Sequence, residues 1–141
     1  MASTGPIVYV EDDEDDISIF TQVLADLGIS NELICFTNTK DTLDYLLTTT
    51  ELVFLIFCDI NLPGKNGLEL KMLIDFTPEL RKKSIPFIFF STTASDADVE
   101  LAYTKMTVQG FFKKPVDYQE MRNILRFISE YWFSCKHPNI L

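Results

Sequence analysis

The stretch Phe54-Leu55-Ile56-Phe57-Cys58-Asp59-Ile60-Asn61-Leu62-Pro63-Gly64-Lys65-Asn66-Gly67 decides the fold class of this chain. An apolar run of strand length leads directly into a single aspartate, Asp59, and a Pro-Gly pair and a second glycine follow. Open α/β sheets present reactive groups in this way, because a buried strand delivers one side chain to its carboxyl end. Aspartate also commonly starts a turn. The role of Asp59 therefore depends on what the rest of the chain supplies.

A run of acidic residues, 11–16, follows the short apolar run Ile7-Val8-Tyr9-Val10. Like charges in such a run repel one another unless water or a cation screens them. The last four acids also suit the first turn of a helix, whose dipole favours negative charge. We interpret Asp15 and Asp16 as helix-capping residues, and the two acids before them partly so.

The first two acids of the run, Glu11 and Asp12, stand where the predicted strand ends. Beside Asp59 they form a group of hard oxygen ligands suited to Mg²⁺, which keeps several waters and takes only one or two carboxylates. Three neighbouring carboxylates are hard to keep ionised without a cation. The sequence therefore predicts a magnesium site at these strand ends.

Two further apolar runs end in chemically useful side chains. One begins after Pro86 and ends in Ser91, and the other begins at Gly110 and ends in Lys114 before a proline. Taken singly, a serine after a strand usually caps the next helix, and a lysine in that position is usually solvated. Four strand ends that carry an acid pair, an aspartate, a hydroxyl and a lysine, in that order, favour a single common site.

Apolar runs alternate with helical patterns along the whole chain, which predicts a parallel sheet covered on both faces. The strand-like runs are 7–10, 33–36, 52–58, 87–90 and 110–113. Apolar spacing predicts helices over 17–27, from Thr39, around 72–76, over 96–106 and over 121–132. Gly28 is expected to close the first helix and Pro78 to follow the third. The result is a (βα)₅ architecture in the α/β class.

The composition and net charge of the chain exclude several classes of function. The chain has 141 residues, 47% of them hydrophobic, and reads as one globular domain. A net charge of −9 argues against nucleic acid as a partner, which requires a basic face. Neither a signal peptide nor an apolar run long enough to span a membrane is evident, so we expect a cytoplasmic protein.

Cys35, Cys58 and Cys135 lack metal-ligand spacing and are interpreted as reduced thiols. His137 is the sole histidine, which argues against a zinc site or a histidine-based triad.

Together, the strand ends resemble those of a response-regulator receiver domain, the phosphoacceptor half of two-component signalling. The similarity extends from about Ile7 to about Trp132, and the segment Asp-x-x-x-Pro-Gly-x-x-Gly from Asp59 and the pair Lys114-Pro115 carry most of it. The resemblance implies a flavodoxin-like, doubly wound five-stranded parallel sheet in the order 2-1-3-4-5. It also places the site at the carboxyl ends of strands 1, 3, 4 and 5, where such sheets bind ligands.

The resemblance assigns roles to these residues. Asp59 would be the phosphoacceptor, and Lys114 would place its ammonium against the acyl phosphate. Asp12, Asp59 and the main-chain carbonyl of Asn61 would bind Mg²⁺, with Glu11 acting mainly through a bound water.

Ser91 would donate a hydrogen bond to the attached phosphoryl group. We prefer it to Thr92, because the family position lies five residues after the proline that begins this strand. Phe111, three residues before Lys114, matches the aromatic switch position of the family, and core packing is an equally open interpretation of this ring.

A single receiver domain is expected over residues 1–141, with a core of about 7–133 and a tail of 134–141. The chain would act as a phosphoacceptor, not as an enzyme with a separate substrate, although its own residues would catalyse phosphorylation and dephosphorylation. The expected partners are a sensor histidine kinase or a histidine phosphotransfer protein, and a downstream protein target. Neither nucleic acid nor a membrane is expected as a partner, and a homodimer is compatible with the sequence.

The chain departs from the family pattern mildly at Glu11 and Ser91 and more clearly near Thr107, where a glycine or its neighbour normally follows the fourth helix. Glycine allows a left-handed turn at little steric cost, so threonine predicts a different helix ending.

Three other functions are alternatives to the receiver interpretation. A Mg²⁺-dependent phosphohydrolase with an aspartyl nucleophile would need a second carboxylate at position 61, where this chain has asparagine. A nucleotide-binding module would need a phosphate loop where the acidic run stands. A structural pseudo-receiver is the third alternative.

Overall fold

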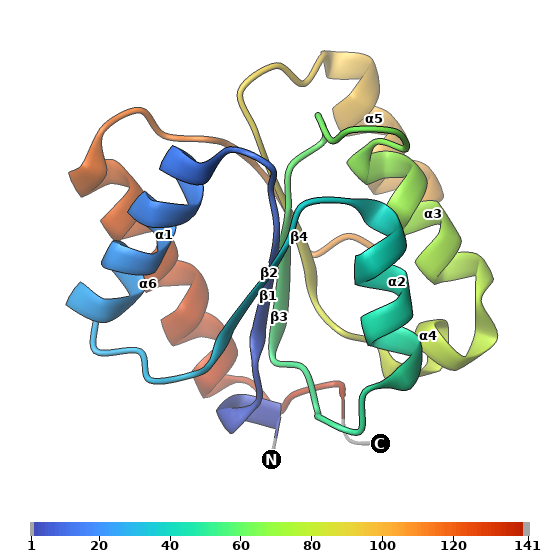
Figure 1. Cartoon of the computed structure of the whole chain (residues 1–141), viewed down its shortest axis with the longest axis horizontal. Coiled ribbons are helices and arrows are strands. Elements are labelled where there is room, and N and C mark those ends of the chain that lie inside the picture. The colour runs from blue at the N-terminus through green and yellow to red at the C-terminus, as the bar shows by residue number, and fades with distance from the viewer. Residues whose placement is uncertain (1, 140–141) are drawn as a thin grey trace.

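Five short strands form one parallel sheet at the centre of the computed structural model, which describes residues 2–139. The strands are β1 (Ile7–Val10), β2 (Leu33–Phe36), β3 (Leu55–Cys58), β4 (Phe87–Ser91) and β5 (Gly110–Lys113). Their order in the sheet is β2-β1-β3-β4-β5, and every neighbouring pair is parallel. Figure 1 shows this sheet edge-on between its helices. This confirms the predicted doubly wound (βα)₅ fold and its strand order.

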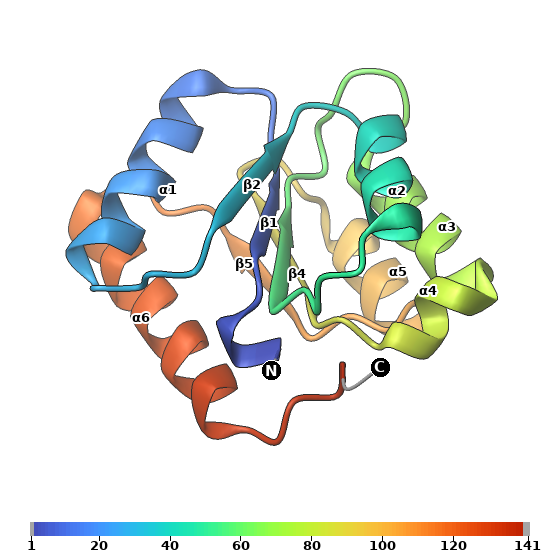
Figure 2. The same ribbon diagram turned by 60° about the horizontal axis from the view of Figure 1, so that its bottom comes forward.

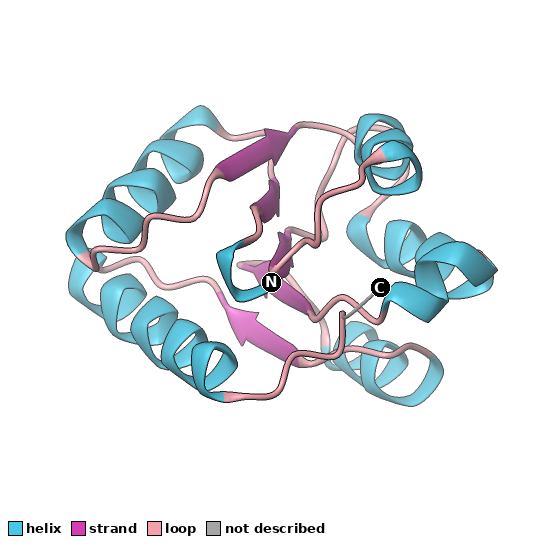
Figure 3. Ribbon diagram, turned by 90° about the horizontal axis from the view of Figure 1, so that it is seen from below, coloured by secondary structure: helices cyan, strands magenta, loops and turns pink. Residues whose placement is uncertain are grey.

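Helices cover both faces of the sheet. They are α1 (Glu14–Asp26), α2 (Thr39–Thr48), α3 (Gly67–Phe76), α4 (Pro78–Lys83), α5 (Asp96–Lys105) and α6 (Tyr118–Ser134), preceded by a 3₁₀ turn, η1 (Ala2–Thr4). Helices α1 and α6 lie together on one face, and α2 to α5 lie on the other, so that the sheet is the middle of three layers (Figure 3). Within residues 2–139, no helix is both long enough and apolar enough to cross a membrane.

The core is divided in two by the sheet, because successive side chains of a strand point to opposite faces. Val8 and Val10 of β1 pack on the side of α2 to α5, whereas Ile7 and Tyr9 pack on the side of α1 and α6. All four residues of β1 are buried. This two-sided burial explains why the strands appear in the sequence as continuous apolar runs and not as alternating ones.

Helix α4 was not predicted. The third helix ends at Phe76, before Pro78 as expected, but Pro78 then occupies the first turn of a further six-residue helix. Proline is well tolerated there, because its missing N–H is one that a first turn leaves unpaired. The helix is too short for apolar periodicity to reveal it.

The segment after α6 folds back onto the sheet (Figure 2). The His137 Nε2 atom lies 2.6 Å from the main-chain oxygen of Phe54, and the Asn139 side-chain amide donates to the oxygen of Val53 at 3.1 Å. These bonds are made to residues just before Leu55, where β3 begins. Only residues 55–58 of the predicted run 52–58 therefore form the strand.

The two helix endings singled out in the sequence differ as expected. Gly28 follows α1 with a left-handed φ of +70°, which suits glycine. Helix α5 ends without such a residue, because Met106 is extended (φ −133°, ψ 161°). Thr107 then donates its N–H to Asp75 Oδ2 at 2.9 Å and its hydroxyl to Asp75 Oδ1 at 2.8 Å, which ties the end of α5 to α3.

Candidate functional site

The register of the sheet brings the four predicted strand ends to one edge. Val10 pairs with Cys58 across β1 and β3, so Glu11 and Asp59 both follow the last paired residues of adjacent strands. The Asp59 N–H donates to the main-chain oxygen of Val10 at 3.0 Å. On the other side, the N–H of Lys114, which directly follows β5, donates at 3.0 Å to the oxygen of Ser91, the last residue of β4. Residues far apart in the sequence thus meet at the carboxyl ends of the strands.

The Lys114 ammonium is the centre of this group. It forms ion pairs with Glu11 Oε1, with Asp16 Oδ2 at 2.9 Å and with Asp59 Oδ2 at 3.3 Å. The Lys114 side chain is only 6% exposed. Burial lowers the pKa of Lys114, but hydrogen bonds to Glu11 and Asp16 outweigh burial and raise that pKa overall. Lys114 is therefore a permanent positive charge among carboxylates.

Glu11 has little capacity left for a further ligand. Its Oε2 atom accepts the N–H groups of Asp12 and Asp13 at 3.0 and 3.4 Å, and its Oε1 atom accepts from Lys114 and from the Tyr9 hydroxyl. Burial raises the pKa of the Glu11 carboxyl to about 7, although Lys114 acts in the opposite direction. Both carboxylate oxygens of Glu11 therefore already accept hydrogen bonds within the chain.

Asp59 and Asp12 are the more available carboxylates. Asp59 is 8% exposed and accepts the Asn61 N–H at 3.3 Å on the oxygen that does not face Lys114. Asp12 is exposed, and its carboxylate has no hydrogen bond or ion pair with any residue in 2–139.

The donor set fits Mg²⁺ only if water and the main chain contribute. Within the described residues, no three acidic, histidine or cysteine side chains stand close enough to hold a metal by themselves. Mg²⁺ takes one or two carboxylates and keeps several waters, so two carboxylates and a main-chain carbonyl are sufficient. The oxygen chemistry at this edge therefore matches that cation.

Ser91 is the last residue of β4 at this edge of the sheet, and Phe111 lies further back on β5, where it pairs with Phe89. Ser91 is 2% exposed, and its hydroxyl oxygen accepts the N–H of Thr93 at 3.3 Å. The side-chain amide of Asn61 donates to the Thr93 hydroxyl, which links the loops that follow β3 and β4. The half-buried ring of Phe111 packs against Phe89, with ring centroids 5.2 Å apart.

Asp16 lies in the first turn of α1, as expected, but it is not the cap, and its side chain has a partner that was not predicted. Asp13 is the cap of α1, since its side chain accepts the N–H groups of Asp15 and Asp16 at 2.8 and 3.2 Å. The Asp16 carboxylate instead reaches Lys114. Asp16 lies four residues before the buried Phe20, on the inward face of the helix. That spacing was the signal that distinguished it from its exposed neighbours.

Comparison with known protein families identifies the family of this chain. Residues 7–126 match the family model of the response regulator receiver domain. The chain belongs to this family.

Individual relatives agree with the family match. The probable methanogenesis regulatory protein FilR2 of Methanothrix harundinacea is 27% identical over 130 residues, covering 89% of this chain and 82% of FilR2. Among solved structures, the phosphorylated cyanobacterial phytochrome response regulator RcpA has a TM-score of 0.80 and 27% identity, covering 92% of this chain and 94% of RcpA. The Mn²⁺-bound form of response regulator Rcp1 has a TM-score of 0.77 and 25% identity, covering 91% of this chain and 94% of Rcp1.

The second glycine of the receiver motif has a steric reason in this chain. A Cβ atom on Gly67 would lie 2.2 Å from the main-chain oxygen of Asp59 and 3.0 Å from Cys58 Sγ. The Gly67 N–H donates to the oxygen of Ile60 at 2.8 Å, which draws the start of α3 close against the Asp59 loop. Any side chain at this position would displace the backbone that holds Asp59.

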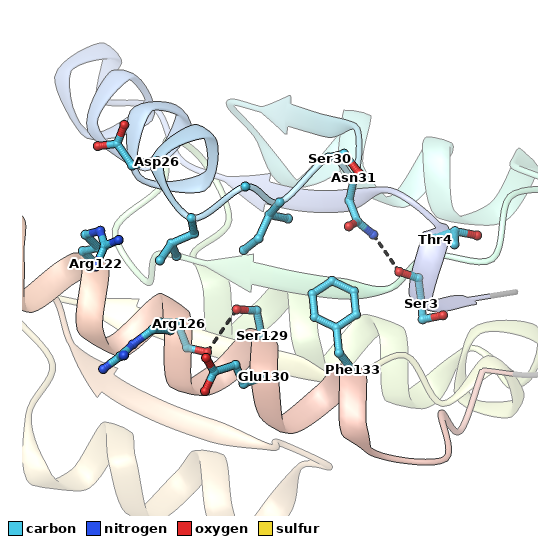
Figure 4. Close-up of a pocket in the computed structure, with 13 residues that line it drawn as sticks. Ser3, Thr4, Asp26, Ser30, Asn31, Arg122, Arg126, Ser129, Glu130 and Phe133 are labelled. Carbon is cyan, nitrogen blue, oxygen red and sulfur yellow. Dashed lines mark hydrogen bonds between the residues drawn. The ribbon is translucent and has the colours of Figure 1, made fainter.

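The receiver chain also has a hollow of about 490 Å³ at the other end of the sheet, between the loop after α1 and helix α6 (Figure 4). Arg122, Arg126 and Phe133 line it, and the Asn31 amide beside it donates to the oxygen of Ser3 at 3.0 Å. None of the carboxylates around Lys114 contributes to its lining. The concave surface and the charged site therefore occupy opposite ends of the strands.

Proposed function

We propose that this receiver domain accepts a phosphoryl group on Asp59 and passes the signal on through protein contacts. The donor would be a sensor histidine kinase or a histidine phosphotransfer protein, and the target a downstream protein. One observation carries the proposal: Asp59 directly follows the central strand β3, and its nearly buried carboxylate faces a lysine ammonium at 3.3 Å. Membership of the response-regulator family supports it.

The transfer step uses an oxygen of Asp59 as the nucleophile. That oxygen forms a bond to phosphorus while the bond between phosphorus and the donor's leaving nitrogen breaks, which gives an aspartyl phosphate. Lys114 lies where negative charge increases during the step. Its ammonium needs little reorganisation, because the surrounding carboxylates already hold it in place.

Mg²⁺ would be held by Asp12, Asp59 and the main-chain carbonyl of Asn61, with Glu11 in contact through water. When bound, it would supply positive charge between the carboxylates and the phosphoryl oxygens. The exposed carboxylate of Asp12, which pairs with no residue in 2–139, and the Mn²⁺-bound state of the related Rcp1 support a divalent cation here.

The signal would leave the site through Ser91 and Phe111. A phosphoryl group on Asp59 would attract the Ser91 hydroxyl, which at present accepts the Thr93 N–H. The Phe111 ring, packed against Phe89 on the neighbouring strand, could then change its position. The surface formed by α5, β5 and α6 would respond, because only contacts that differ between the two states shift the equilibrium.

Incubation with acetyl phosphate and Mg²⁺, followed by intact mass spectrometry, tests the proposal. The wild-type chain should gain one phosphoryl group, and Asp59→Asn should gain none because an amide cannot form the acyl phosphate. Asp44→Asn, an exposed substitution with the same charge change on α2, should behave as wild type. A label that persists in Asp59→Asn would place the nucleophile elsewhere. A wild-type chain that takes no phosphate would be a structural pseudo-receiver.

A further inference from the structure

We infer that Asp16 is a positioning residue for phosphoryl transfer, which anchors the Lys114 ammonium from helix α1. The inference rests on the proposed function of Asp59 and adds a residue outside the set assigned to the metal and the phosphoryl group. Its basis is the ion pair between Lys114 Nζ and Asp16 Oδ2 at 2.9 Å, which is shorter than the 3.3 Å contact of the same ammonium with Asp59.

The ammonium of lysine has three N–H donors, and three carboxylates receive them here. Glu11 comes from the end of β1, Asp59 from the end of β3 and Asp16 from the first turn of α1. A single contact would leave the flexible lysine free to swing about its stem. Contacts in three directions fix both the place and the orientation of the charge.

The three contacts differ in what the reaction does to them. Phosphorylation changes the group bonded to Asp59, so the Lys114 bond to that oxygen must be exchanged for one to a phosphoryl oxygen. Glu11 also takes part in the proposed metal site. Asp16 has neither task, and its side chain is 32% exposed, compared with 1% for Glu11 and 11% for Asp59. It is the one contact that can stay unchanged throughout the transfer.

Asp16 is itself held firmly. Its N–H donates to the capping side chain of Asp13 at 3.2 Å, and α1 is fixed to the sheet by the buried Phe20 four residues later. The chain beyond Lys114 gives less support, because Val116 is 98% exposed. The position of the ammonium therefore depends on its carboxylate partners, and Asp16 supplies the partner on the helix side.

A matched pair of neighbouring aspartates tests this inference. Asp16→Ala and Asp15→Ala remove the same charge from the same helical turn, but the Asp15 side chain is exposed and makes no hydrogen bond or ion pair with any residue in 2–139. At saturating acetyl phosphate and Mg²⁺, Asp16→Ala should phosphorylate about tenfold more slowly than wild type, which is the scale of one lost charge-assisted hydrogen bond. Asp16→Asn should lose less, since its amide oxygen still accepts a hydrogen bond. Asp15→Ala should stay within about twofold. Equal rates for the two alanine variants would overturn the inference.

A second measurement needs no phosphorylation. In protein labelled with ¹⁵N-lysine, the Lys114 ammonium should give a slowly exchanging signal, assigned by its loss in Lys114→Arg. Asp16→Ala should shift this signal and speed its hydrogen exchange, and Asp15→Ala should not. An unchanged signal in Asp16→Ala would refute the anchoring role. If the wild-type chain takes no phosphate, the proposed function of Asp59 fails, and the anchor is then judged on this signal alone.

Discussion

Two lysines are buried in the part of the chain that the structure describes, and they differ in the charge that surrounds them. Lys114 is 6% exposed and lies among three carboxylates at the carboxyl ends of the strands. Lys71, on α3, is 3% exposed and pairs with a single carboxylate, Asp75, at 2.8 Å. Its ammonium also donates to the Thr107 hydroxyl at 3.0 Å and lies 5.2 Å from the centre of the Phe87 ring.

The charge balance separates a site for chemistry from a structural contact. One ammonium against three carboxylates leaves negative charge in excess, which a further cation can relieve. Around Lys71, one ammonium pairs with one carboxylate, and the Arg81 cation also acts on Lys71, so negative charge is not in excess. The pKa values follow this difference, because burial lowers the pKa of Lys71 overall, whereas the excess of acids raises that of Lys114. Burial alone therefore does not identify a functional lysine.

Replacing Lys114 should produce the largest effect. Lys114→Met should slow phosphorylation by acetyl phosphate about 100-fold or more, because the transition state loses a fixed positive charge. The initial rate of label incorporation, measured with Lys71→Met beside it, checks the contrast. Comparable rates for the two variants would remove the functional distinction between the lysines.

Replacing Lys71 should affect stability instead. Lys71→Met should lower the free energy of unfolding by about 3 kcal/mol, because it leaves Asp75 partly buried without its cation. Urea unfolding measures this loss, and phosphorylation should stay within about twofold of wild type. The control is Lys40→Met, which breaks an equally spaced pair with Asp44 that is open to solvent. If both substitutions cost the same, burial is not what gives the Lys71 pair its strength.

Thr107 tests how far the structural contact depends on the hydroxyl. Thr107→Val keeps the shape of the side chain but removes its hydrogen bonds to Lys71 and Asp75. The free energy of unfolding should fall by about 1 kcal/mol. Backbone hydrogen exchange at the end of α5 should also become faster, since this contact fixes that end to α3. Unchanged exchange there would mean that the main-chain bond to Asp75 suffices.

The half-buried His137 is expected to give the smallest effect. Its Nδ1 atom accepts the Asn139 N–H at 2.9 Å, and its Nε2–H donates to the main-chain oxygen of Phe54. Each nitrogen of the neutral ring therefore has a hydrogen-bond partner. Burial lowers its pKa below the ordinary value of 6.5. Its contribution to stability should therefore be complete above pH 6.5 and be lost as the pH falls through the depressed pKa. Urea midpoints at pH 7.5 and 5.0 should differ more for wild type than for His137→Gln, and parallel behaviour would exclude this linkage.

The sheet could be predicted because its information is local. Each buried strand is a continuous apolar run, and the family motifs stand directly at the strand ends. The structure brings Glu11, Asp59, Ser91 and Lys114 to one edge, as the alternation of strands and helices required. The contacts between distant helices were not readable in the same way. Lys40 and Asp44 have the same spacing as Lys71 and Asp75, yet one pair is exposed and the other buried.

The missing information is tertiary. What distinguishes the buried pair is the arrival of Thr107 from the end of α5, and no pattern within α3 records that. The contact of Asp16 with Lys114 was not predicted for a similar reason, because Lys114 lies 98 residues further along the chain.

The return of the C-terminal segment to the start of β3 has a practical consequence for experiments. His137 and Asn139 hold this segment beneath the sheet, near the N-terminal turn and opposite the edge that carries Asp59 (Figure 1). A biotin or fluorescent label joined ahead of η1 would face away from an approaching phosphodonor. Immobilisation through that end should leave the phosphoacceptor edge free for binding assays. A label joined after Asn139 would instead lie next to the hydrogen bonds of His137 and Asn139 to the start of β3, and we expect it to disturb them.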